Sequence, residues 1–242
     1  GPFTTDEVHK AIDSLHNGKS PGIDSCMVPE VIKYGGSLIR NQIRHVCNEV
    51  LETNVAPTQW TNNLVVPVPK KGNLQLMTNY RGITLMSIAA KVYSKLLFNR
   101  IIPVVDKLLR PNQAGFRKER SCIQQIHIIR RIMEGAAAKQ LPLIITFIDF
   151  KKAFDSINRN TMFAILRHYG IPEKLVQAIK ALYDGSTSRV FIDGKMSKEF
   201  DISTGVLQGD VLAPSLFIIV MDYVMRLSER EHGFTTQLKE SQ

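Results

Sequence analysis

The segment from Leu141 to Asp149 constrains the fold of this chain more than any other. It is a continuous apolar run that ends on a carboxylate. Such a run is typical of a central strand buried on both faces, because a half-exposed strand would alternate apolar with polar residues. An Asp at the end of such a strand caps the following turn or binds a hard cation such as Mg²⁺. The run alone leaves both interpretations of Asp149 open.

The remaining apolar periodicities predict helices. A capping box of the S/T-x-x-E form at Thr4 begins the first helix, and Gly18 ends it. Further helices are expected at about residues 29–51, 87–109, 122–138, 159–169, 173–183 and 210–226, with a break at Pro103 in the second of these.

Short strands are predicted elsewhere. Residues 64–69 are β-branched and apolar, but their prolines confine them to an edge strand or a short piece. Residues 79–85 are a second short strand or a loop, and residues 188–203 are a β-hairpin that turns at Asp193-Gly194. Because these elements do not alternate as a regular βαβ series, the sequence favours an α+β fold.

Composition sets the broad class. The 242 residues are 44% hydrophobic and 22% charged, which is ordinary for a globular protein with a sizeable core. The net charge of +9 favours polyanionic partners, although this alone is a weak sign of nucleic-acid binding. The apolar runs are too short to cross a membrane. The sequence does not indicate an oligomeric state.

The cysteines and the amino-terminus suggest a compartment. Cys26, Cys47 and Cys122 have neither zinc-ligand spacing nor the pattern of a disulfide framework, so they are expected to be buried thiols in a reducing environment. The first residues lack the basic and apolar regions of a signal peptide. We therefore expect an intracellular protein, nuclear or cytoplasmic and not secreted. The absence of an initial Met suggests an internal boundary or a processed end.

A second informative block spans residues 205–217, with the sequence GVLQGDVLAPSLF. Two glycines flank Gln208, and glycine allows another molecule to approach the backbone closely. The simpler interpretation is a hairpin-to-helix turn in which Asp210 is the N-terminal cap of the next helix.

These blocks, in this order, resemble the motifs of reverse transcriptases. Residues 147–155 resemble motif A, and residues 205–217 resemble motif B. Further resemblances to the non-LTR (LINE-like) retrotransposon class lie upstream, at residues 19–24, 57–72, 79–85 and 113–117. Each motif alone is weak, but the series covers nearly the whole chain. A group II intron maturase is the nearest relative to exclude.

The resemblance implies a right-hand polymerase architecture with fingers and palm. Residues 1–56 would be an N-terminal helical extension, residues 57–140 the fingers and residues 141–242 a partial palm, with no thumb. The implied reaction is addition of deoxynucleotides to a primer 3′-hydroxyl, catalysed by two Mg²⁺ ions. The implied partners are an RNA template, a DNA primer and deoxynucleoside triphosphates.

Individual roles follow from the resemblance. Asp149 would be catalytic and bind both metal ions, and the Phe150 carbonyl would be a further ligand. Phe154 occupies the steric-gate position, where an aromatic ring excludes a ribose 2′-hydroxyl. The remaining expected contacts are Gln208 and Gly209 with the nucleotide and the template–primer, Lys70 or Lys71 with Arg81 on the triphosphate, and Arg117 on nucleic acid.

Each of these residues has a structural alternative. Phe154 could be part of the core, and Lys70 and Lys71 a solvated turn. Arg81 could pair with a carboxylate, and Arg117 is expected to brace the fingers more than to touch substrate. The alternatives for the acidic residues are that Asp155 caps the next helix and that Asp193 and Asp201 serve the hairpin.

One departure from the family pattern matters. The family's motif C, an aromatic-x-Asp-Asp hairpin, has no match here, and neither Asp184 nor Asp222 is a credible substitute. One carboxylate cannot organise two Mg²⁺ ions, and the missing hairpin would leave the 141–149 strand with an open edge and an exposed apolar face. We therefore expect a fragment or a truncated copy that is inactive alone. The alternatives are a non-catalytic nucleic-acid-binding remnant or a decayed copy without function.

Overall fold

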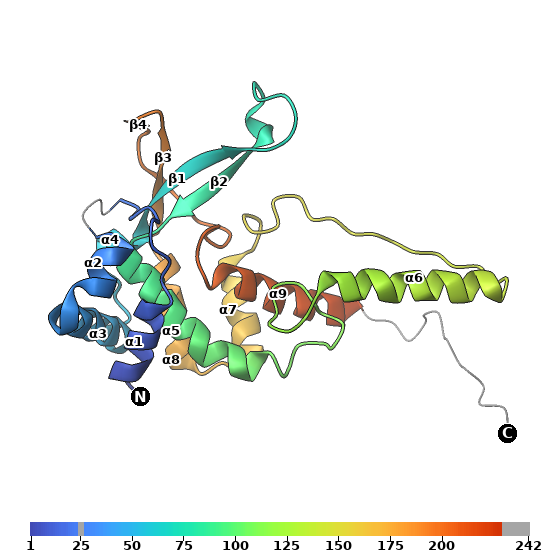
Figure 1. Cartoon of the computed structure of the whole chain (residues 1–242), viewed down its shortest axis with the longest axis horizontal. Helices are drawn as coiled ribbons and strands as arrows, with labels where there is room; N and C mark the ends of the chain where they lie inside the picture. The colour runs from blue at the N-terminus through green and yellow to red at the C-terminus, as the bar shows by residue number, and fades with distance from the viewer. Residues whose placement is uncertain (24–26, 229–242) are drawn as a thin grey trace.

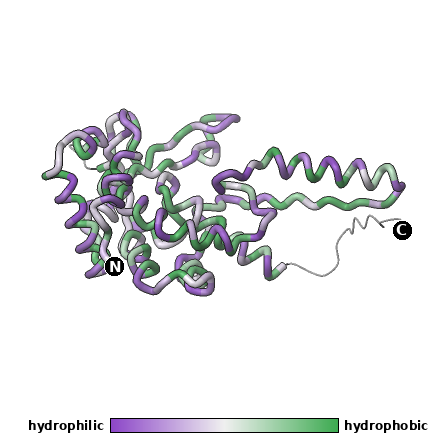
Figure 2. The backbone as a smooth tube through the Cα atoms, turned by 60° about the horizontal axis from the view of Figure 1, so that its bottom comes forward, coloured by the Kyte–Doolittle hydropathy of each residue, from purple (hydrophilic) through white to green (hydrophobic). Residues whose placement is uncertain are grey.

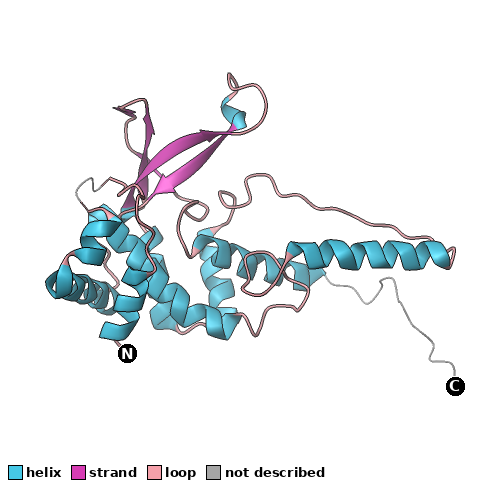
Figure 3. Ribbon diagram, viewed as in Figure 1, coloured by secondary structure: helices cyan, strands magenta, loops and turns pink. Residues whose placement is uncertain are grey.

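The computed structural model describes residues 1–23 and 27–228 of the chain. Helices form a body at the amino-terminal end, the strands extend from one side of it, and one long helix projects away from it (Figures 1 and 3). Asp24, and the tail from residue 229 for which the sequence predicted no element, lie outside the described residues.

The first helix begins at its predicted capping box but ends at Asp13, before the predicted stop at Gly18. In α1 (Thr5–Asp13) the Thr4 hydroxyl accepts from the Glu7 amide, and the Glu7 carboxylate accepts from the Thr4 amide, which confirms the capping box. The helix expected at residues 29–51 is divided into α2 (Pro29–Tyr34) and α3 (Gly36–Thr53). The division falls at Gly36, whose φ of +78° is not helical. The short helix α4 (Thr58–Thr61) follows.

One mixed sheet joins distant parts of the chain. Its strands are β1 (Asn62–Pro69), β2 (Tyr80–Leu85), β3 (Thr187–Ile192), β4 (Lys195–Met196) and β5 (Phe200–Asp201), and a 3₁₀ turn (Met77–Asn79) precedes β2. The strand order is β2-β1-β3-β4, and β5 also pairs with β3. Strand β1 runs antiparallel to β2 and parallel to β3.

The prolines were expected to confine β1 to an edge strand or a short piece, and the edge-strand alternative was wrong for the first half of β1. Residues 62–65 pair with β3 on one side, and residues 64–69 pair with β2 on the other. Pro67 and Pro69 lie beyond the residues that pair with β3, so a missing N–H removes no hydrogen bond on that side. The predicted hairpin turn is confirmed, because Asp193 (φ 49°) and Gly194 (φ 77°) both have the positive φ of a type I′ turn.

The remaining helices are α5 (Ile88–Val105), α6 (Cys122–Ala138), α7 (Arg159–His168), α8 (Glu173–Tyr183) and α9 (Ala213–Ser228). All of them except α6 contribute to one continuous core. Cys122, at the start of α6, is exposed, so the prediction of a buried thiol was wrong there. The buried cluster includes Ile12, Leu97, Leu182 and Ile219 from four of the helices. Helix α5 continues through Pro103 and ends two residues later. The core therefore spans all three sequence ranges that the resemblance suggested as separate parts.

The predicted buried strand at residues 141–149 is absent from the structure. This segment forms no regular element, and its large side chains other than Leu143 are exposed, with Ile144 at 92% and Phe147 at 81%. A buried strand needs neighbours that satisfy its backbone and cover its faces, and no described strand pairs with this segment. It runs back along α6, whose only buried residue is Ala136 (Figure 1). Hydrophobic colour follows this returning segment in Figure 2.

Candidate nucleotide-binding surface

The turn at Gln208 and Gly209 docks on the free edge of the sheet. The Thr84 amide of β2 donates a 2.7 Å hydrogen bond to the Gln208 carbonyl oxygen. Gly209 has φ +137°, and a Cβ there would collide with the Thr84 carbonyl oxygen. The glycine is therefore required by the backbone of β2 itself.

The other end of this loop docks on the turn that follows Asp149. The Gly205 amide donates to the Ile157 carbonyl at 2.7 Å, and the Val206 amide donates to the Phe154 carbonyl at 2.8 Å. A Cβ on Gly205, whose φ is +77°, would lie 2.7 Å from the Phe154 carbonyl oxygen. Residues 205–210 thus join the 152–157 turn to β2, and both glycines admit parts of this chain.

Two exposed basic residues lie on the β1–β2 hairpin. Val68 pairs with Arg81, and the Lys70 amide donates to the Asn79 carbonyl at 2.7 Å, which extends the ladder by one residue. Lys70 and Arg81 are therefore diagonal cross-strand neighbours on one face. No ion pair or hydrogen bond of the Arg81 side chain occurs within the described residues, so its predicted alternative, a structural carboxylate, is not found there. Lys71 lies in the exposed bend beyond.

Phe154 lies in a cluster of three aromatic rings. It stacks on Phe217 of α9 with centroids 5.0 Å apart and an interplanar angle of 22°. Phe116 meets it edge-on, with centroids 6.3 Å apart and an angle of 88°. Phe154 is half-buried against the core. It therefore has both a packed face and an accessible part.

Asp149 and Phe150, the predicted metal ligands, lie on an exposed segment. Both are exposed in the extended segment after α6. Within residues 1–23 and 27–228, no group of three or more His, Cys, Asp or Glu residues could hold a metal ion. Mg²⁺ prefers several oxygen ligands in a near-octahedral arrangement, so the residues in this arrangement do not fit a two-ion site.

The other acidic residues are structural. Asn158, not Asp155, caps α7, because its side chain accepts from the Thr161 amide at 3.0 Å; the prediction for Asp155 was wrong. The buried Asp210 carboxylate accepts from the Leu212 amide at 3.2 Å, just before α9, and from the Tyr183 hydroxyl at 3.2 Å. Burial raises the pKa of Asp210, although these hydrogen bonds oppose the shift. Asp201 pairs with Thr187 in the sheet.

Arg159 supports the 205–210 loop from behind, and the sequence analysis missed it. Its Nε donates to the Gly205 carbonyl at 2.9 Å, and its Nη1 donates to the Tyr183 carbonyl at 2.7 Å and to the Ser186 hydroxyl at 3.0 Å. Desolvation by burial lowers the pKa of Arg159. The available signal was a cation at the first position of a helix, where the helix dipole disfavours positive charge.

Arg117 is committed to its own loop. Its side chain is only 4% exposed and bonds to the Asp106 carboxylate at 2.7 Å. It also donates to the carbonyl oxygens of Asp106, Arg110 and Gln113. These contacts support the bracing interpretation, because contact with nucleic acid would require breaking them.

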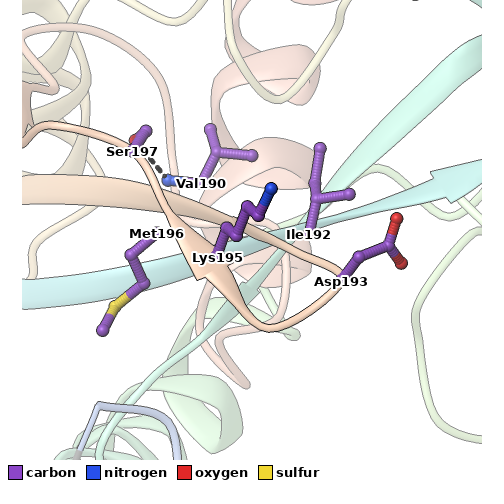
Figure 4. Close-up of a pocket in the computed structure, with 6 residues that line it drawn as sticks. All are labelled: Val190, Ile192, Asp193, Lys195, Met196 and Ser197. Carbon is purple, nitrogen blue, oxygen red and sulfur yellow. Dashed lines mark hydrogen bonds between the residues drawn. The ribbon is translucent and has the colours of Figure 1, made fainter.

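Two hollows of the surface have none of the predicted nucleotide contacts in their linings. A hollow of about 340 Å³ lies at the β3–β4 hairpin, where Figure 4 shows Val190, Asp193, Lys195 and Ser197 around it. A second, of about 220 Å³, is mainly apolar and lies between the 150–158 turn and α9, with Phe150 at its margin. Neither brings carboxylates together.

Comparison with known families decides the relationship. Residues 68–238 match the family described as reverse transcriptase (RNA-dependent DNA polymerase). The chain belongs to the reverse transcriptase family. The match covers the end of β1, all of β2, the 147–155 segment and the 205–217 loop together.

The relatives of this reverse transcriptase chain are mobile-element proteins. It is 24% identical to the transposon TX1 149 kDa protein of Xenopus laevis over 91% of the chain and 17% of that protein. It is 29% identical to the Pol polyprotein of the type-2 retrotransposable element R2DM of Drosophila melanogaster over 72% of the chain and 17% of the relative. It is 26% identical to the RNA-directed DNA polymerase of the Drosophila melanogaster element jockey over 89% of the chain and 24% of the relative.

These matches confirm the resemblance to the non-LTR class of reverse transcriptases. The chain spans less than a quarter of the length of each of these relatives. No described helix is both long and apolar enough to cross a membrane.

Proposed function

We propose that this chain binds nucleotide and template–primer within an RNA-directed DNA polymerase of a non-LTR retroelement. The proposed partners are an RNA template, a DNA primer and deoxynucleoside triphosphates. The observation that carries the proposal is the hydrogen bond between Thr84 and Gln208, because it fixes the motif B turn beside the strand that bears Arg81.

Each proposed contact has a suitable side chain. Lys70 and Arg81 supply exposed cations for the triphosphate, one as a point charge and one as a fork of donors. Phe154 presents the accessible part of its ring to the sugar, and Gln208 and Gly209 lie against the base and the template–primer. Lys71 and Arg117 are weaker candidates, because one lies in the bend beyond the strand and the other is committed to its loop.

Asp149 and the Phe150 carbonyl remain the proposed Mg²⁺ ligands. The described residues form no group of three or more His, Cys, Asp or Glu side chains that could hold a metal ion. We therefore propose that the chain by itself binds substrates without incorporating nucleotides, and we assign no catalytic step to it.

Titration with dATP and Mg²⁺ in the presence of an RNA–DNA hybrid tests the nucleotide contacts. Because a hydrogen bond to a charged group contributes about 1.5–3 kcal/mol, Arg81→Ala should weaken dATP binding by about tenfold or more. The matched control is Lys195→Ala on the β3–β4 hairpin, which should bind dATP as the parent does. Equal effects of the two substitutions would contradict the proposed surface.

Primer extension separates this proposal from a non-catalytic nucleic-acid-binding remnant. Hybrid binding that weakens steeply with salt, dATP binding and no incorporation would support our proposal for the chain alone. Hybrid binding without any nucleotide binding would favour the remnant. Incorporation that is lost in Asp149→Ala would show that substrate binding assembles a metal site, and would contradict the proposed inactivity.

A further inference from the structure

Asp222 of α9 is a fully buried carboxylate with four hydrogen bonds. Its Oδ1 accepts from the Arg110 amide at 3.1 Å and from Arg110 Nε at 3.0 Å. Its Oδ2 accepts from the Tyr169 hydroxyl at 2.6 Å and from Arg226 Nε at 2.8 Å. Its side chain is 0% exposed. We call Asp222, Arg110, Tyr169 and Arg226 the Asp222 latch.

The latch holds the loop that follows α5, residues 106–117, onto α9. Arg110 belongs to this loop, and Arg226 of α9 also donates to the Leu108 carbonyl at 2.6 Å. Arg117 holds the loop together from within through the carboxylate of Asp106 and the carbonyls of Arg110 and Gln113. Asp222 and Arg226 of one helix thus bond the loop to α9, and Leu109, which is buried in the core, packs beside these bonds.

The end of this loop carries Phe116 to the ring of Phe154. Phe116 is 65% exposed and has φ +56°, so neither burial nor local backbone preference fixes its position. Its neighbour Arg117 is bonded into the loop, and the Phe116 ring meets Phe154 edge-on. Because α9 also supplies Phe217, which stacks on Phe154, one helix positions both aromatic neighbours of that ring.

The chemistry of the latch suits positioning better than stability. Burial would raise the pKa of Asp222, but the hydrogen bonds from Tyr169, Arg226 and Arg110 outweigh it and hold the pKa at about 2. The carboxylate is therefore ionised at neutral pH. Replacing a buried ion pair by well-packed apolar groups is often neutral or stabilising, and the best-attested use of such a pair is to specify one arrangement.

We propose that Asp222 is a positioning residue, which holds the 106–117 loop on α9 so that Phe116 closes one edge of the Phe154 ring. The inference deepens the proposed function, since it rests on Phe154 facing the nucleotide sugar. A displaced Phe116 would leave that ring less constrained and reduce discrimination against a ribose.

The first test reads the loop without any nucleotide. Phe116→Trp places a fluorescent indole on the loop, and Trp60, which is 3% exposed, reports the core in the parent chain. Because the side chain at position 116 is already 65% exposed, adding Asp222→Asn should raise the acrylamide quenching of this loop indole by up to about half and leave quenching of Trp60 unchanged. The matched control, Asp201→Asn, should change neither. Unchanged quenching of the loop indole would overturn the proposal. Equal acrylamide quenching of the loop indole and of Trp60 would also overturn it.

A second variant covers the case in which Asp222→Asn does not fold. Arg226→Lys keeps the charge next to Asp222 but lacks the second nitrogen that reaches the Leu108 carbonyl. It should make the loop indole more accessible to acrylamide in a folded chain. Quenching of that indole at the parent level in this variant would overturn the proposal.

The second measurement is the ratio of dATP to ATP affinity in the presence of Mg²⁺. The parent should prefer dATP, and Asp222→Asn should lose much of the preference while binding dATP with similar affinity. A loosened loop with an unchanged ratio would overturn the role in positioning Phe154. If the parent binds neither nucleotide, the proposed function fails, and the quenching measurement alone decides whether the latch sets Phe116.

Discussion

The amide of Thr84 donates its outward-facing hydrogen bond to the carbonyl of Gln208, on the edge of β2 away from β1. Strand β2 would otherwise present a free edge there. The motif B turn closes this edge, and the same contact places Gln208 beside the strand that carries Arg81. Structural closure and the proposed substrate contact therefore depend on one short turn.

Gly209→Ala should destabilise the chain because a Cβ meets the Thr84 carbonyl and φ +137° is strained for any other residue. We expect a loss of about 2–4 kcal/mol in the free energy of unfolding, measured in urea. Gly135→Ala in α6 is the control, since nothing lies within 4 Å of a Cβ there. It should be neutral or stabilise by up to about 1 kcal/mol, and equal losses would contradict the docking of the turn.

Arg159→Ala should cost more than removal of an exposed arginine. The substitution leaves the buried Gly205 carbonyl without its Arg159 donor, so we expect about 2–3 kcal/mol of destabilisation. Arg189→Ala breaks an exposed pair with Glu199 and should cost about 1 kcal/mol or less. Urea unfolding of both variants checks the order, and a smaller effect at Arg159 would contradict its role.

Asp210→Asn should make the chain less sensitive to rising pH. The pKa of Asp210 is raised by burial, so the folded chain binds this proton more tightly than the unfolded chain. The folded state therefore loses stability as the pH rises from about 3.8 through the raised pKa. Asn lacks this proton, so the variant should gain relative to the parent across that window. Thermal unfolding of both proteins over a pH series measures this difference. An equal change of melting temperature with pH in the parent and the variant would contradict our expectation.

Asp222 should have the opposite effect on the pH dependence of stability. Its pKa of about 2 lies below the ordinary 3.8, so its contribution is complete above about pH 4 and is lost as the pH falls toward 2. The shift corresponds to about 2 kcal/mol. Acid unfolding of the parent and of Asp222→Asn separates the contribution of Asp222 from those of other carboxylates. A difference in the free energy of unfolding that does not change with pH would exclude this contribution.

Phe147→Ser should leave stability almost unchanged. The ring is 81% exposed, so we expect a change within about 0.5 kcal/mol. Leu182→Ala in the core should cost about 2–5 kcal/mol. A large loss at Phe147 in urea unfolding would indicate that the 141–149 segment is buried in solution, as its sequence predicted.

Local chemistry made some of this structure predictable. The capping box at Thr4 and the Asp193-Gly194 turn act within a few residues, so their sequences specify them. Gly205 and Gly209 indicated a close approach, but nothing local showed that the approaching backbone was that of Phe154 and Thr84. A single sequence can therefore indicate that a glycine is needed for a close approach without indicating which residue approaches it.

The failures have a common physical cause. The 141–149 run has the composition of a buried strand, but burial also requires neighbours that the run itself does not encode. The contacts of Asp222 with Arg110 join residues 112 positions apart, and those of Arg159 with Gly205 span 46 positions. No periodicity carries information over such separations. The motif series supplied the family, whereas the roles proposed for Asp149, Phe154 and Arg81 await measurement.

The parallel pairing of β1 with β3 has a consequence for synthesis. The Thr187 hydroxyl bonds to the Asn62 side chain at 2.7 Å across 125 residues of sequence. Pairing at such separation is entropically slow, and on the ribosome it must wait until β3 has emerged. During that interval one edge of β1 stays open, so the nascent hairpin is a natural target for chaperones, and premature termination before residue 187 would yield a chain prone to aggregation.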